Sequence, residues 1–181
     1  MQITKIVFAM VAALMIAAPT AQAAVLLEPY VGYHTGSYKW QGAGQEEVDM
    51  KGMSYGARLG YSSAIGFMVG ADFMKGAWQD SDTPKADIDL TDLGIFVGYD
   101  FPVMVRVYGV YGLSSKATAS YTGGETDIDG TSLKLGVGFT VLPLVSVNLE
   151  YYTSTLETDT SPAAEMDVAM YGLSVSLPFE F

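Results

Sequence analysis

Five ionisable residues stand out because they interrupt segments that are otherwise apolar or rich in glycine. Arg58, Arg106 and Lys134 are basic, whereas Asp72 and Glu150 are acidic. If all five face one enclosed interior, they need partners there, because an unpaired charge removed from water is costly. The pattern predicts a buried network of ion pairs. The alternative is a narrow, gated ion path lined by the same residues.

Acidic residues form the second candidate group. Many of the 20 Asp and Glu residues fall in four polar segments, which are 40–50, 79–89, 117–130 and 156–167. Solvated links between structural elements would have this composition. The alternative is divalent-cation binding, since Ca²⁺ and Mg²⁺ prefer oxygen ligands. Asp127 and Asp129 are the candidates for such external contacts, although the remaining positions of a calcium-binding loop are absent around them.

A serine hydrolase is the third kind of chemistry to consider. His34 is followed by Ser37, and Asp80 is followed by Ser81. Such an enzyme needs its hydroxyl, imidazole and carboxylate within hydrogen-bonding reach of one another, and the sequence alone does not place these residues together. We therefore expect no enzymatic activity. A single histidine and the absence of cysteine also argue against a zinc site, and no cofactor is expected.

The N-terminal residues have the features of a secretory signal peptide. Lys5 precedes an apolar run over residues 6–18, and Ala21-Gln22-Ala23 provides a small-x-small cleavage pattern. This run is too short for a membrane-spanning helix. We predict that residues 1–23 are removed and that residues 24–181 form one exported domain. The formal net charge of −11 disfavours nucleic-acid binding, because phosphate backbones repel an acidic chain.

Beyond the signal peptide, hydrophobic residues recur at every second position, which is the period of a β-strand. In the last segment, one face carries Tyr171, Leu173, Val175, Leu177, Phe179 and Phe181. Eight segments with this alternation can be counted. They are 27–39, 51–62, 65–77, 93–101, 103–115, 133–141, 144–155 and 171–181.

Short and long connections alternate between these segments. Tight turns are expected at 62–66, 100–103 and 142–145, and the four polar segments named above would form the longer links. This alternation is typical of an up-and-down meander that carries turns at one rim and loops at the other. The sequence therefore predicts an all-β fold, an eight-stranded antiparallel up-and-down barrel.

The period alone does not say which face points inward. The less apolar face is rich in glycine, which weakens a solvent-exposed strand but makes room inside a narrow barrel. The apolar face is too bulky for the lumen of eight strands. Aromatic residues gather near strand ends, as at membrane interfaces; they are Tyr61, Phe67, Tyr99, Phe101, Phe179 and Phe181 near the turns and Phe73, Trp78, Tyr111, Tyr151 and Tyr171 near the loops.

These features predict a transmembrane barrel whose apolar face contacts lipid. A soluble barrel with its apolar face turned inward is the alternative, and it would make a small-ligand carrier. By the same alternation, the lumen side of the membrane barrel also carries Glu28, His34, Asp92 and Asp100. A lone histidine on such a glycine-rich face is expected to be a hydrogen-bonded filler.

The C-terminal run Tyr171-Gly172-Leu173-Ser174-Val175-Ser176-Leu177-Pro178-Phe179-Glu180-Phe181 resembles the signal by which the barrel-assembly machinery recognises outer-membrane proteins. With the alternation over 27–181, the mature chain resembles the small OmpA-like and OmpX-like outer-membrane β-barrels. The resemblance implies a place in the outer membrane of a Gram-negative cell, and we expect a monomer because a closed barrel has no edge that forces association. Its partners would be outer-membrane lipid and lipopolysaccharide, with the assembly machinery during biogenesis. Pro178 departs from the pattern and, because it lacks a ladder donor, predicts a bulge or fraying.

The resemblance also implies a function. We expect a non-enzymatic envelope protein that contributes to envelope integrity or to surface interaction through acidic external loops. One alternative is a lipid A-modifying outer-membrane enzyme that depends on His34. The other is a narrow channel or a path for small hydrophobic solutes.

Overall fold

A computed structural model of the chain describes residues 23–41, 47–80, 87–121, 124–142, 144–158 and 164–181. Apart from its last residue, the predicted signal peptide lies outside these ranges, so its cleavage stays a prediction. Within the described part of the chain, no helix has the length and apolar character to cross a membrane.

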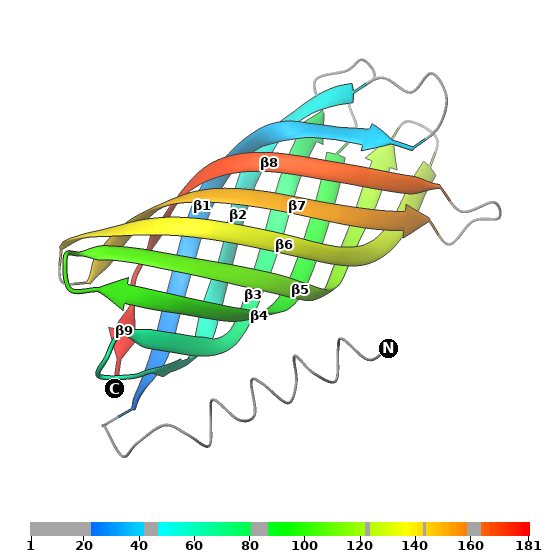
Figure 1. Cartoon of the computed structure of the whole chain (residues 1–181). Helices are drawn as coiled ribbons and strands as arrows, with labels where there is room; N and C mark the ends of the chain where they lie inside the picture. The colour runs from blue at the N-terminus through cyan, green and yellow to red at the C-terminus, as the bar shows by residue number, and fades with distance from the viewer. Residues whose placement is uncertain (1–22, 42–46, 81–86, 122–123, 143, 159–163) are drawn as a thin grey trace.

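Eight long strands follow one another along the described chain (Figure 1). They are β1 (Ala24–Trp40), β2 (Glu47–Ser62), β3 (Phe67–Asp80), β4 (Asp87–Phe101), β5 (Val105–Tyr121), β6 (Gly124–Leu142), β7 (Val145–Thr158) and β8 (Glu165–Ser176), and a short β9 (Phe179–Glu180) follows β8. Neighbours pair antiparallel, and both β8 and β9 return to β1. The predicted closed, eight-stranded antiparallel up-and-down barrel is confirmed.

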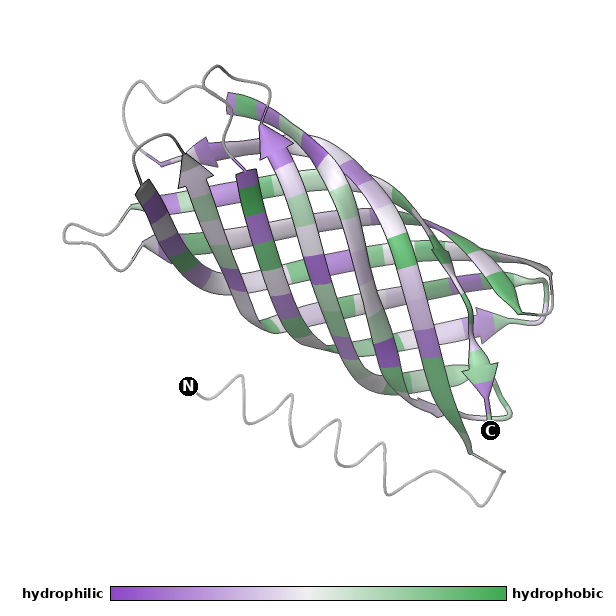
Figure 2. Ribbon diagram, turned by 180° about the vertical axis from the view of Figure 1, so that it is seen from behind, coloured by the Kyte–Doolittle hydropathy of each residue, from purple (hydrophilic) through white to green (hydrophobic). Residues whose placement is uncertain are grey.

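The alternation along each strand separates the outside of the barrel from its lumen. In β1, Val31 and Tyr33 are exposed, whereas Glu28 and His34 are buried. Figure 2 shows hydrophobic and hydrophilic residues taking turns along the strands. Because an exposed apolar belt on a closed barrel is stable only against hydrocarbon, the outward apolar face confirms the transmembrane orientation and contradicts the soluble alternative.

Tight turns join the strands at the rim near the C-terminus. Between β2 and β3, the amide of Gly66 donates to the carbonyl oxygen of Ser63 at 2.8 Å. Gly66 has a φ of +88°, a left-handed conformation that glycine adopts without steric cost. The turn between β4 and β5 ends with Met104, also at positive φ. The third predicted turn includes residue 143, which lies outside the described residues.

The connections at the opposite rim are shorter than predicted. The strands run through most of the four polar segments and leave residues 41–46, 81–86, 122–123 and 159–164 between them. The prediction of long acidic loops was therefore wrong. Its error lay in reading polar composition as loop, because apolar residues such as Met50, Ile88 and Ile128 still alternate there and continue the strands as buried side chains.

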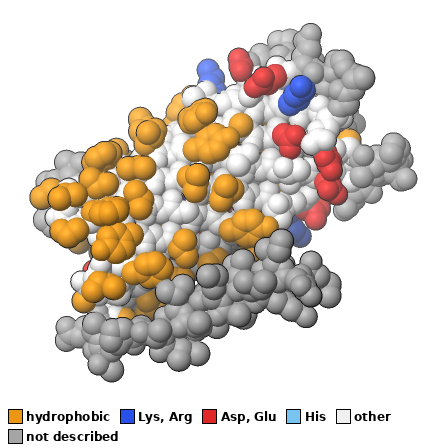
Figure 3. All heavy atoms as spheres, viewed as in Figure 1, with side chains coloured by type: hydrophobic (Ala, Val, Ile, Leu, Met, Phe, Trp, Pro, Cys, Tyr) orange, Lys and Arg blue, Asp and Glu red, His pale blue; other side chains and the backbone are white. Residues whose placement is uncertain are grey.

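The sense of the alternation inverts toward this outer rim. Here the outward side chains are polar, as at Asp89 and Asp129, and the inward ones are apolar. The inward side chains form one buried cluster, which we call the outer plug: Tyr30, Met50, Met74, Trp78, Ile88, Leu90, Ala117, Ile128, Tyr152, Leu156, Met166, Val168 and Met170. Figure 3 shows hydrophobic side chains over one end of the barrel and charged ones over the other.

Strand length explains this inversion. A tilted strand crosses a membrane with about 9–11 residues, whereas these strands have between 12 and 19. The surplus protrudes beyond the bilayer as a barrel that faces water. There the usual rule of a soluble fold applies, with apolar residues inside. Trp78 follows this rule, and its assignment to the outer aromatic girdle was wrong because it is buried in the plug.

Irregularities interrupt the regular pairing of the barrel wall, one of them between Thr140 and Leu142 of β6. A β-bulge in β5 shifts the register between Gly112 and Ser115, so the inward positions change from even to odd numbers. Pro178 lies between β8 and β9, as the missing ladder donor predicts. The register of both strands against β1 is unchanged, so the strand is interrupted there without the inserted residue of a bulge.

Candidate functional site

The lumen contains a connected network of buried charges at the level of the apolar belt. Arg58 lies at its centre and contacts three carboxylates from three different strands. Its Nε is 3.1 Å from Asp72 Oδ2, and its Nη2 is 3.2 Å from Glu150 Oε1. Its Nη1 is 3.3 Å from Glu28 Oε1. Arg58 and Asp72 are direct cross-strand partners, which fixes their contact through the register of β2 and β3.

The two other predicted bases extend this network. Lys134 Nζ is 2.9 Å from Asp72 Oδ1 and 3.0 Å from the Tyr30 hydroxyl oxygen. Arg106 Nη1 is 2.8 Å from Glu28 Oε1, and its Nε is 2.6 Å from Asp100 Oδ1. Glu28 thus joins Arg106 to the centre. The structure brings the five predicted residues into one network, with Glu28 as the link that they need.

Aromatic and hydroxyl groups complete the shell of the network. The Arg58 guanidinium lies 4.0 Å from the ring centroid of Tyr108 and 4.8 Å from that of Tyr30, within the range of cation–π attraction. Tyr108 also donates its hydroxyl to Glu150. Sequence reasoning missed both tyrosines as members of the site. Their even-numbered positions, on the inward face with Glu28 and Arg106, were the signal that could have found them.

His34 is a hydrogen-bonded member of the same network. Its Nε2 lies 3.2 Å from Glu150 Oε2, and its Nδ1 lies 3.2 Å from Ser54 Oγ. Each of these three residues is at most 1% exposed. A serine, a histidine and a carboxylate are therefore in contact, but in a place that substrate cannot enter without unpacking the lumen.

The enzyme candidates named from the sequence do not meet. Ser37 lies an odd number of positions from His34 and donates its hydroxyl to Glu47 outside the lumen. Asp80 is buried at the end of β3 and accepts a hydrogen bond from Tyr38 at 3.3 Å. Ser81 lies outside the described residues.

Apolar clusters lie on both sides of Arg58, the centre of the charge network. The outer plug packs above it, and Leu26, Met68, Phe96, Tyr108 and Val110 form a second cluster toward the turns. Large enclosed side chains such as Trp78, Tyr152 and Phe96 are at most 2% exposed. Among the described residues the lumen is filled around Arg58, so the network acts as a structural cross-link between strands.

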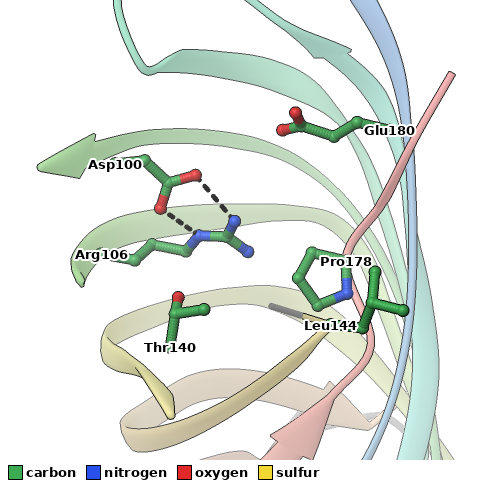
Figure 4. Close-up of a pocket in the computed structure, with 6 residues that line it drawn as sticks. All are labelled: Asp100, Arg106, Thr140, Leu144, Pro178 and Glu180. Atoms are coloured by element: carbon green, nitrogen blue, oxygen red, sulfur yellow. Dashed lines mark hydrogen bonds and ion pairs between the residues drawn. The ribbon is translucent and has the colours of Figure 1, made fainter. Parts of the chain in front are cut away.

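A small cavity of about 310 Å³ opens at the turn rim. Its lining residues are Asp100, Arg106, Thr140, Leu144, Pro178 and Glu180, and Figure 4 shows Arg106 turned toward Asp100. Because Arg106 is already paired with Asp100 and Glu28, it offers no free charge to an anionic ligand.

Asp127 and Asp129 lie on β6 and not in a loop. Both side chains point outward and are exposed. Thr118 donates its hydroxyl to Asp127 Oδ1 at 2.8 Å, and Asp129 lies opposite Lys116 and Glu157 in the sheet. In the part of the chain that the structure describes, no three His, Cys, Asp or Glu residues are grouped as a metal site.

Comparisons with known proteins agree with this architecture. The family model described as outer membrane protein beta-barrel domain matches residues 7–179. The attachment invasion locus protein Ail of Yersinia pestis, solved with the heparin analogue sucrose octasulfate, is similar with a TM-score of 0.60 and 16% identity over 86% of this chain and 99% of Ail. Neisserial surface protein A is similar with a TM-score of 0.56 and 18% identity, over 83% and 97%. Comparison with curated proteins found no match.

Proposed function

This chain belongs to the family of outer membrane protein beta-barrel domains, and we propose that it is a non-enzymatic outer-membrane protein that acts through its external rim. The filled lumen is the observation that carries this proposal. Because the centre of the charge network, around Arg58, lies between two apolar clusters, chemistry and transport through the barrel both require unpacking. The surface that remains for contact is the part of each strand beyond the membrane.

The charge of this rim favours a cationic partner. The outward face of β6, β7 and β8 carries Glu125, Asp127, Asp129, Glu157, Glu165 and Asp167. The sequence of these three strands contains one base, Lys134, and its side chain lies in the lumen. Sucrose octasulfate, seen with Ail, is a polyanion, and this rim would repel it. We therefore propose surface interaction with basic groups as the main function.

Cell-surface binding tests this proposal. Cells that display the wild-type protein should bind beads coated with polylysine more than beads coated with heparin, and the difference should shrink at high salt. Replacement of Asp127, Asp129 and Glu157 by the matching amides should remove most of the polylysine binding. Cold-SDS gel mobility controls for folding of the variant. Equal binding by wild type and variant would reject the acidic rim as the interaction surface.

The other functions have separate tests. A role in envelope integrity predicts that a deletion strain becomes sensitive to detergent, even if bead binding is unaffected. If the protein were a lipid A-modifying enzyme, the deletion strain would have altered lipid A, and a strain with the His34→Ala variant would show the same alteration. The burial of His34 argues against this function. A narrow channel predicts discrete openings in planar bilayers, and the two apolar layers argue against them.

A further inference from the structure

The apolar belt ends at a definite residue on every strand. Counting outward side chains toward the outer rim, the last large apolar residues of β1 to β8 are Tyr33, Met53, Phe73, Leu93, Leu113, Leu133, Tyr151 and Tyr171. The next outward positions, past the bulge residue Ser114 in β5, form what we call the boundary ring. It consists of Thr35, Lys51, Lys75, Thr91, Lys116, Thr131, Thr153 and Ala169.

Charge is sorted by height around this boundary. The boundary ring has three lysines and no carboxylate. The carboxylates begin at the outward positions farther from the belt, which carry Glu47, Asp49, Asp87, Asp89, Glu125, Asp127, Asp129, Glu157, Glu165 and Asp167. In a chain with 20 acidic and nine basic residues, this order is opposite to what composition alone would give. The edge of the belt therefore favours positive charge and avoids negative charge.

The three ring lysines are available for an external partner. The ion pairs among the described residues are made by His34, Arg58, Arg106 and Lys134, all in the lumen. Lys51, Lys75 and Lys116 are exposed and take part in none of them. Lys116 lies opposite Asp129 in the sheet but is not within ion-pair distance in the described structure.

The neighbours of these lysines suit the edge of a bilayer. Lys75 is flanked across the sheet by Tyr55 and Thr91, and Phe73 lies one outward step below it. Aromatic rings prefer the interface between hydrocarbon and headgroups, and a lysine stem can extend along apolar surface while its ammonium group reaches the polar layer. The lysines thus stand where lipid phosphates lie.

We propose that Lys51, Lys75 and Lys116 bind the phosphate groups of lipopolysaccharide in the outer leaflet. The ring lies at the rim opposite the tight turns, which is the external rim of an outer-membrane barrel. The carboxylates lie farther from the apolar belt than the phosphate layer, so their repulsion by the phosphates is small. This inference rests on the outer-membrane placement and not on the proposed contact with cationic partners, so each can fail separately.

Binding of purified lipopolysaccharide to the full mature barrel in detergent micelles tests the proposal. EDTA is present throughout, so that divalent cations cannot bridge lipid to the acidic rim. Each lysine near an anionic surface contributes about a fivefold gain in affinity. We expect about a fivefold loss for each of K51Q, K75Q and K116Q, and roughly a 100-fold loss for the triple variant.

Lys39 provides the matched control. It is also exposed and outward, but it lies two outward steps beyond Thr35 of the ring. K39Q should bind within about twofold of wild type. Micelles with phosphatidylglycerol in place of lipopolysaccharide separate the two lipid sources, and wild type should bind that lipid more weakly. Cold-SDS mobility identifies folded variants, and the single variants serve if the triple variant does not fold.

Three results would overturn the proposal. The triple variant, or the folded single variants, could bind lipopolysaccharide as wild type does. K39Q could lose as much affinity as K75Q, which would indicate a general charge effect without a site at the boundary. Phosphatidylglycerol could bind as tightly as lipopolysaccharide, which would remove the assignment to this lipid.

Discussion

Arg58 is the residue whose loss should destabilise the barrel most. It is 1% exposed and contacts Asp72, Glu150 and Glu28 at 3.1, 3.2 and 3.3 Å. Removal of one partner from a buried ion pair costs about 3–5 kcal/mol, because the other charge is left without compensation. Three such costs do not add here, since each carboxylate keeps a second partner, namely Lys134, His34 or Arg106.

We therefore expect the Arg58→Met variant to lose about 3–5 kcal/mol of unfolding free energy in total. That loss raises the unfolding constant by roughly 100- to 4,000-fold. Urea unfolding of the protein in lipid vesicles, followed by the fluorescence of its two tryptophans, measures it. Trp78 is a suitable probe because it lies in the outer plug.

Two further variants make the measurement decisive. Lys39→Met removes one positive charge from an exposed position and should change stability by about 0.5 kcal/mol or less. The double variant R58M/E150Q should cost less than the sum of the two single variants, by about 0.5–3 kcal/mol. If the unfolding free energy of the Arg58→Met variant lies within about 1 kcal/mol of that of wild type, the charges do not compensate one another in a dry lumen and the reasoning is wrong.

Three other changes test packing, the lumen core and the lipid face by the same unfolding assay. A Cβ at Gly172 would lie 2.6 Å from His34 Nε2, so Gly172→Ala should lower the unfolding free energy by about 1–3 kcal/mol. The control Gly109→Ala should be nearly neutral, because Gly109 faces outward and the nearest atom to its new Cβ would be 3.4 Å away. Leu90→Ala should cost about 2–5 kcal/mol if the outer plug is a packed core, and Asp89→Ala on the outside should not. Leu135→Lys in the apolar belt should cost about 2–4 kcal/mol and Thr155→Lys beyond it about 1 kcal/mol or less; equal costs would mean that the belt is misplaced.

The sequence by itself determined the strand count, the closure and the outward direction of the apolar face. These follow from the period of two, because side chains on neighbouring positions of a strand point to opposite faces. The same parity identified Arg58, Arg106 and Lys134 as inward residues in advance. The same rule was not applied to His34 and Ser37, although their odd spacing puts them on opposite faces of one strand.

Only the tertiary structure decided which inward charges touch and where the membrane ends. Register brings Arg58 opposite Asp72, but its contacts with Glu28 and Glu150 cross the lumen, and no pattern along the chain encodes that distance. The polar segments continue as strands because apolar residues such as Met50 and Ile128 gain a shared core once the barrel has closed. A single segment has no such shared core to stabilise it. Likewise, the sorting of charge at the boundary ring becomes visible when all eight strands are placed side by side.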